Sequence, residues 1–176
     1  MVILVAAVAL YWRARFEHGA RPRSSDRLVT WSARALVLLG GATLAVGTVV
    51  TAAGPHSGAT KGENVGRLDF RGAQTLEWIV QRHGSLAVVF FLASVAVLLL
   101  ARSRKADPLL VRTLHVLVGL IFVQLVVGIT QWLLKLPAEL VWVHVGLATI
   151  IWIWLLLAVA AAGQLESSPA PVVSAE

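Results

Sequence analysis

The chain has 176 residues, of which 58% are hydrophobic and only 14% are charged, and its mean hydropathy is +0.81. This composition excludes an ordinary soluble domain, whose charged share is nearer to ~25%. The chain has no cysteine, and its formal net charge is +6.

The first residues, "MVILVAAVALYW" (1–12), form an apolar segment that is about 18 Å long as a helix, too short to cross a bilayer. Positive charges follow this segment instead of preceding it, which is not typical of a signal peptide. We expect residues 1–12 to be the remnant of a transmembrane helix. We expect residues 13–34 to form a cytoplasmic, Arg-rich linker.

Four longer apolar segments follow, at roughly 35–53, 76–101, 113–134 and 140–162. Each supplies about the 20 residues that a spanning helix needs, and none alternates with period two. The sequence therefore predicts an all-α integral membrane protein: an up-down four-helix transmembrane bundle over 35–163, preceded by the partial amino-terminal helix. The polar residues 164–176 are expected to form a disordered cytoplasmic tail.

The distribution of lysine and arginine predicts the orientation of this bundle. Ten of the cations fall in two connections on one side: Arg13, Arg15, Arg21, Arg23, Arg27, Arg34, Arg102, Arg104, Lys105 and Arg112. Five fall on the other side: Lys61, Arg67, Arg71, Arg82 and Lys135. We expect the Arg-rich side to lie on the cytoplasmic side of the cell membrane. The rule explains the positive charge, so nucleic acid is not needed as a partner.

Two similar phrases, "RHGSLA" (82–87) and "VHVGLA" (143–148), each place a histidine near the start of a helix that runs inward from the outer face. His83 lies about 14 Å and His144 about 10 Å from the expected helix starts, so the two depths agree. The second and fourth helices of an up-down bundle lie diagonally opposite each other, about 14 Å apart. Two imidazoles and an iron between them need about that span.

Small residues accompany both histidines. Ala87 and Ala148 share the helical face of their histidine, where a flat macrocycle needs room, and Gly84 and Gly146 lie nearby. Small residues also line many helix contacts that hold no cofactor. The segments "LAVGTVVTAAG" (44–54) and "LVVGITQW" (125–132) form a second repeat, which predicts two related hairpins with a binding site between them.

The other histidines and the tryptophans have separate interpretations. His115 is expected to be a packed or interfacial neutral imidazole, and His18 to be solvated in the Arg-rich loop. His56 follows a Gly-Pro turn at the outer rim and is a functional candidate. Most tryptophans fit an aromatic belt. Trp152 and Trp154 lie deeper and either pack on a porphyrin or fill the bundle.

"GTVVTAAGPHSG", then "QRHG", then "LPAELVWVHVGLA" together resemble the carboxy-terminal half of the haem A synthase family of cytochrome oxidase assembly, actinobacterial type, over roughly residues 28–162. Proteins of this family typically have eight transmembrane helices in two similar halves. The resemblance implies that His83 and His144 are the axial ligands of a haem b iron. It also implies that "VILVAAVALYWRARF" corresponds to the end of the family's fourth helix.

The family oxidises haem O to haem A, and its amino-terminal half is where haem O is thought to bind. The resemblance therefore implies an oxidoreductase part that supplies the haem b electron-transfer half. A partner chain, a second copy of this chain or a longer reading frame would provide the substrate half. Arg82, Arg67 and His56 are the expected cofactor-binding residues around the haem, with Arg71 and Lys61 as further cations for the propionates.

Two alternatives stay open. A general b-type transmembrane electron carrier needs a second histidine pair near the cytoplasmic face, where His115 has no evident partner. A haem-free assembly or scaffold protein would use its histidines only for packing. Whether the chain is an enzyme by itself is left open by the sequence.

Overall fold

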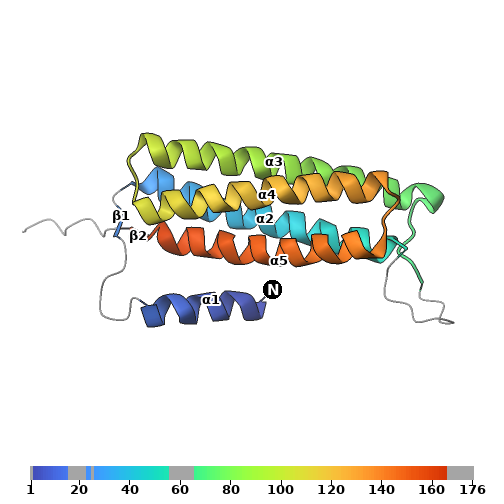
Figure 1. The fold of residues 1–176 in the computed structure, drawn as a ribbon, viewed down its shortest axis with the longest axis horizontal. Coiled ribbons are helices and arrows are strands. Elements are labelled where there is room, and N and C mark those ends of the chain that lie inside the picture. The colour runs from blue at the N-terminus through green and yellow to red at the C-terminus, as the bar shows by residue number, and fades with distance from the viewer. Residues whose placement is uncertain (1, 16–22, 25, 56–65, 166–176) are drawn as a thin grey trace, which may run out of the picture.

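The computed structural model describes residues 2–15, 23–24, 26–55 and 66–165, and the described part is almost entirely helical (Figure 1). Helix α1 (Val2–Arg15) is followed by four long helices: α2 (Arg27–Ala53), α3 (Thr75–Ser103), α4 (Pro108–Leu133) and α5 (Ala138–Ala161). The four long helices are long and apolar enough to cross a membrane. The predicted fold class is confirmed, and this is the architecture of a multi-pass membrane protein.

The four long helices form an up-down bundle in which α3 and α5 occupy diagonal corners (Figure 1). Helix α2 packs against α3 and α5, and α4 packs against the same two helices. Helix α1 lies along the outside of α5. Helices α3 and α5 therefore run in the same direction, and their equivalent turns face each other across the centre of the bundle.

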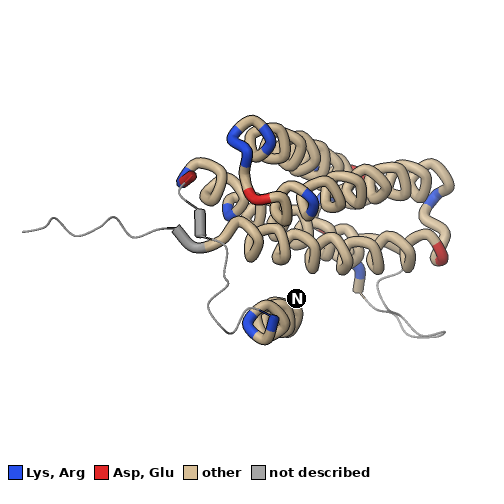
Figure 2. The backbone as a smooth tube through the Cα atoms, turned by 60° about the vertical axis from the view of Figure 1, so that its left-hand side comes forward, with Lys and Arg blue, Asp and Glu red and all other residues tan. Residues whose placement is uncertain are grey.

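The two ends of the bundle differ in charge. At the end where α2 and α4 begin, which we call the Arg-rich end, lie the charged turns of the α3–α4 hairpin (Figure 2). At the other end, the histidine end, a short 3-10 turn (η1, Gly72–Gln74) leads into α3, and a tight turn joins α4 to α5. The described cations of the α3–α4 turn thus lie at the same end as the start of α2.

Helix α2 begins at Arg27, well before the apolar segment expected from residue 35. The Asp26 side chain explains this start, because it accepts a hydrogen bond from the Val29 backbone N–H at 3.0 Å and caps the helix. The Thr30 hydroxyl reaches the Ala162 carbonyl at 3.4 Å, which ties the start of α2 to the end of α5. A two-residue parallel pair, β1 (Arg23–Ser24) with β2 (Gln164–Leu165), closes the same end.

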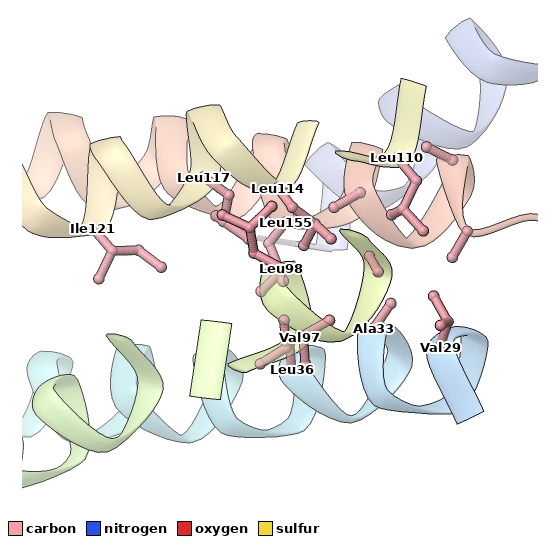
Figure 3. Packing of buried hydrophobic residues seen from close by; sticks show 14 of the residues in the cluster. Val29, Ala33, Leu36, Val97, Leu98, Leu110, Leu114, Leu117, Ile121 and Leu155 are labelled. Carbon is pink, nitrogen blue, oxygen red and sulfur yellow. The ribbon is translucent and has the colours of Figure 1, made fainter. Parts of the chain in front are cut away.

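The apolar core occupies the half of the bundle next to the Arg-rich end (Figure 3). Its most deeply buried large side chains are Leu114, Leu117, Leu155 and Val29. In the other half, no residue is buried in four facing stretches: 41–52 of α2, 80–89 of α3, 122–133 of α4 and 138–150 of α5. The buried side chains near the histidine end, among the described residues, include Ala53, Thr75 and Ile79, which are not part of the core cluster.

Candidate functional site

His83 and His144 face each other across the diagonal of the bundle. Their ring centroids are 6.2 Å apart and the ring planes make an angle of 66°. His83 follows the start of α3 at Thr75 and His144 follows the start of α5 at Ala138 by similar lengths of helix. The expectation of two imidazoles at one depth, pointing inward from opposite corners, agrees with this arrangement.

A glycine of the neighbouring helix makes room for each ring. A Cβ at Gly47 of α2 would lie only 3.0 Å from Cε1 of His83, and a Cβ at Gly128 of α4 would lie 3.2 Å from Cε1 of His144. Both distances are shorter than the ~3.5–4.0 Å of a comfortable carbon–carbon contact. In each hairpin, the histidine ring therefore packs against a glycine of the preceding helix. The two glycines occupy equivalent positions of the internal repeat.

The two nitrogens of each ring have different surroundings. Nδ1 of both His83 and His144 is shielded from solvent and has no hydrogen-bond partner among the described residues. Nε2 is not shut off in this way, so it is the nitrogen of each ring that remains available to a ligand.

Two more polar atoms, on α4, are buried without a partner among the described residues: Gln124 Oε1 and Gln131 Oε1. The same holds for Trp152 Nε1 in the apolar core. The Gln124 amide also donates through Nε2 to the backbone carbonyl of His144 at 3.0 Å, which joins α4 to α5 at the level of the ligand candidate. Buried polar atoms without partners are uncommon and point to a group that the chain alone does not supply. Sequence reasoning missed both glutamines.

The small residues expected beside the histidines fall into two groups. Ala87 and Ala148 are partly buried, on the stretches of α3 and α5 around the two histidines. A Cβ at Gly84 or at Gly146 would meet nothing within 4 Å. Packing within the chain therefore does not require these two glycines, in contrast to Gly47 and Gly128.

The expected propionate cations lie at the histidine end but contact other groups. The guanidinium of Arg82 lies over the Trp78 ring, 4.5 Å from its centroid, and that of Arg71 lies 5.1 Å from the same centroid. Phe70 meets Trp78 edge-on at 5.7 Å. Arg67 is exposed. A role of Arg82 and Arg67 toward a cofactor stays a prediction.

His115 is not part of this site. His115 is exposed at the opposite, Arg-rich end, where its Nδ1 lies 2.8 Å from the Val111 carbonyl. His56, His18 and Lys61 lie outside the described residues, as does the tail from residue 166. Trp152 is buried in the apolar core, and its ring would lie 3.8 Å from a Cβ at Gly41.

Comparisons with protein-family models, with curated proteins and with solved structures found no match to this chain. The functional argument therefore depends on the geometry of the site and on the resemblance of the motifs.

Proposed function

We propose that the bundle binds one haem b between His83 and His144 and serves as a membrane electron-transfer module. The distance between the two imidazoles carries the proposal. Two metal–nitrogen bonds of about 2.0 Å, with about 1.15 Å from each nitrogen to its ring centre, separate the ring centres by about 6.3 Å. The observed separation is 6.2 Å. Edge-to-face ring pairs also span about 4.5–7 Å, so the spacing supports the proposal together with the motifs around both histidines.

The surroundings of the rings support a large, flat and mostly apolar occupant. The four helices bury no side chain over the stretches around the two histidines. A porphyrin would contact the apolar faces that the chain leaves uncovered there. The described residues contain no cluster of three or more histidine, cysteine or carboxylate ligands, so a bare metal ion with only protein ligands fits less well.

The residues of the chain would hold and orient the group. His83 and His144 would hold the iron through Nε2, and Gly47 and Gly128 would let the rings approach their neighbouring helices. Gln124 fixes the backbone of His144 against α4. Iron with two imidazole ligands has no open position, so when bound it would supply one-electron transfer rather than direct activation of oxygen.

The electron-transfer role is proposed in the context of haem A synthase, which converts haem O to haem A for cytochrome c oxidase. The motifs around His83 and His144, which resemble the carboxy-terminal half of that family, support this context. The chain would supply the haem b half, and the haem O site would lie on a partner chain, a second copy or a further segment. Arg82 and Arg67 remain the proposed cations for the propionates, and His56, which lies outside the described residues, remains a proposed cofactor-binding residue.

We further propose that the Arg-rich end faces the cytoplasm and the histidine end faces outward, in a plasma membrane. Because the chain has no cysteine, single-cysteine variants report this orientation cleanly. In intact cells, a membrane-impermeant maleimide should label Leu134→Cys and should label Ser103→Cys only after lysis. Both side chains are exposed in the turns at the two ends. The reverse pattern of labelling would overturn the orientation.

The haem proposal is tested by a reduced-minus-oxidised difference spectrum of the purified protein, with haem extracted and quantified. The wild type should show a b-type signal and about one haem per chain. His83→Ala and His144→Ala should each lose most of it, because one axial ligand then remains. His115→Ala is the matched control and should keep full haem content.

Two outcomes would contradict the proposal. A wild-type protein produced with a sufficient supply of haem, yet lacking the b-type signal, would favour the haem-free scaffold. Full haem content in both His83→Ala and His144→Ala would mean that other residues bind the iron. The alternative of a two-haem transmembrane carrier gains no support, since no second histidine approaches His115 among the residues that the structure describes.

A further inference from the structure

A groove of about 580 Å³ lies at the Arg-rich end, at the turn between α3 and α4. Its polar lining consists of basic side chains: Arg102 from the last turn of α3, Lys105 from the hairpin turn, and Arg112 and His115 from α4. None of the described residues that line it is acidic, and Val111 and Val116 contribute apolar surface. The volume falls in the ~300–1,000 Å³ range of small-molecule sites.

The positive charges of the groove are not neutralised within the described part of the chain. The ion pair found there joins Arg104 to Asp26 at 3.7 Å, and Arg104 does not line the groove. The nearest acid in sequence, Asp107, accepts a hydrogen bond from the Leu109 backbone N–H at 2.7 Å as the cap of α4, forms no ion pair with the groove cations in the described structure and is not a lining residue. Arg102, Lys105 and Arg112 thus present their charge to whatever enters the groove.

The backbone of the turn places Lys105 in the groove. Lys105 has a φ of 50°, in the left-handed region that glycine adopts with least strain. The Lys105 N–H donates to the Arg102 carbonyl at 3.1 Å and the Ala106 N–H donates to the Ala101 carbonyl at 2.9 Å, which closes the helix end. A glycine could form the same turn without the charge, so this residue separates the fold of the turn from its electrostatics.

His115 adds a polar group on the α4 side of the groove. Its Nδ1–H donates to the Val111 carbonyl at 2.8 Å, which leaves Nε2 as the ring nitrogen without a partner in the described structure. The apolar surface of Val111 and Val116 continues from the basic rim onto the outside of the bundle. A ligand with an anionic head and an apolar tail would match both parts of this lining.

We propose that this groove binds the phosphate headgroup of an anionic phospholipid, with the start of an acyl chain on Val111 and Val116. The groove lies at the end of membrane-spanning helices, where lipid headgroups are the anions present at high local concentration. Each lysine or arginine near a bilayer surface strengthens such binding by about fivefold. The proposal does not depend on haem binding.

The test measures dissociation constants for the full-length protein in a neutral detergent by native mass spectrometry. The probes are dihexanoyl phosphatidylglycerol, dihexanoyl phosphatidylcholine and inorganic phosphate. The wild type should bind phosphatidylglycerol at least tenfold more tightly than phosphatidylcholine. Lys105→Gly and Arg112→Gln should each weaken phosphatidylglycerol binding by about fivefold and leave phosphatidylcholine binding unchanged.

Lys135→Gly is the matched control. Lys135 occupies the equivalent left-handed position, φ 60°, in the turn between α4 and α5 at the opposite end of the bundle. Its replacement removes one charge from a turn of the same kind and should leave lipid binding unchanged. Equal binding of the two lipids, or an equal loss in Lys135→Gly and Lys105→Gly, would overturn the proposal. Inorganic phosphate binding as tightly as phosphatidylglycerol would mean that the groove takes free phosphate instead.

Discussion

Replacing Gly47 or Gly128 by alanine adds one methyl group where a histidine ring packs. Each replacement should weaken haem binding while leaving the helices intact. In Gly47→Ala the new Cβ would lie 3.0 Å from Cε1 of His83, so the ring has to retreat by about 0.5 Å to reach an ordinary contact. In Gly128→Ala the distance to His144 is 3.2 Å, which requires a retreat of about 0.3 Å. In the apoprotein each half-buried ring can turn away, but a ring held by iron cannot do so without straining the bond.

The expected magnitude follows from the cost of overpacking, about 1–3 kcal/mol. This corresponds to haem binding weaker by about fivefold to 150-fold. Gly47→Ala should have the larger effect because its contact is closer. The apoprotein should not be destabilised, since alanine favours a helix over glycine by about 1 kcal/mol. Haem transfer to apomyoglobin gives the relative affinities, and thermal unfolding gives the stability of the apoprotein.

Gly119→Ala provides the control, because a Cβ at this position of α4 would meet nothing within 4 Å. It should share any gain in helix stability and show no loss of haem affinity. Haem affinities equal to wild type in both Gly47→Ala and Gly128→Ala would refute the reasoning that iron holds the rings against α2 and α4. A loss in Gly119→Ala as large as that in Gly47→Ala would refute it as well.

His144→Met should retain haem with mixed ligation and a higher midpoint potential in a redox titration, because thioether ligation favours reduced iron; an unchanged potential contradicts ligation by His144. Asp26→Ala should lower the free energy of unfolding by about 1 kcal/mol through loss of the helix cap. Asp26→Asn keeps a capping acceptor and should cost much less, since the ion pair to Arg104 is largely exposed. Lys135→Gly should raise stability by about 1 kcal/mol by relieving its left-handed backbone, seen as a higher unfolding midpoint. Gln124→Leu should cost at most about 1 kcal/mol in the apoprotein, because the lost hydrogen bond is offset by removal of the unpartnered Oε1; a larger loss in thermal unfolding would contradict this.

The sequence was sufficient to predict the helices and the meeting of the two histidines. Apolar segments of spanning length fix the number of helices, and up-down connectivity makes α3 and α5 diagonal neighbours. The depth of a residue in the membrane follows from its distance to the helix start. The sequence alone therefore predicts similar depths for His83 and His144. These inferences depend only on length and direction along each helix.

Contacts that depend on rotation about the helix axes could not be predicted in the same way. Gly47 and Gly128 were noticed as a repeat, but nothing in the pattern showed that they face the histidines. Arg82 was expected to face a cofactor because it adjoins His83 in sequence. Neighbouring residues in a helix point about 100° apart, however, and residues four apart lie on one face. The Arg82 guanidinium accordingly lies over Trp78.

The apolar core, which stabilises the bundle, and the proposed haem site lie in different halves of the bundle. The core cluster fills the Arg-rich half, where Leu114, Leu117 and Leu155 are fully buried, and it does not extend over the stretches around His83 and His144. A bundle whose packing continued to the histidine end would have been more stable alone but could not have accepted a porphyrin. Gly47 and Gly128 are 81 positions apart, whereas His83 and His144 are 61 apart. The loop between glycine and histidine is therefore longer in the first hairpin than in the second, although the glycine–histidine contacts correspond. The site therefore requires only that, in each hairpin, the helical turn with the histidine faces the helical turn with the glycine. It does not require the two hairpins to match over their whole length.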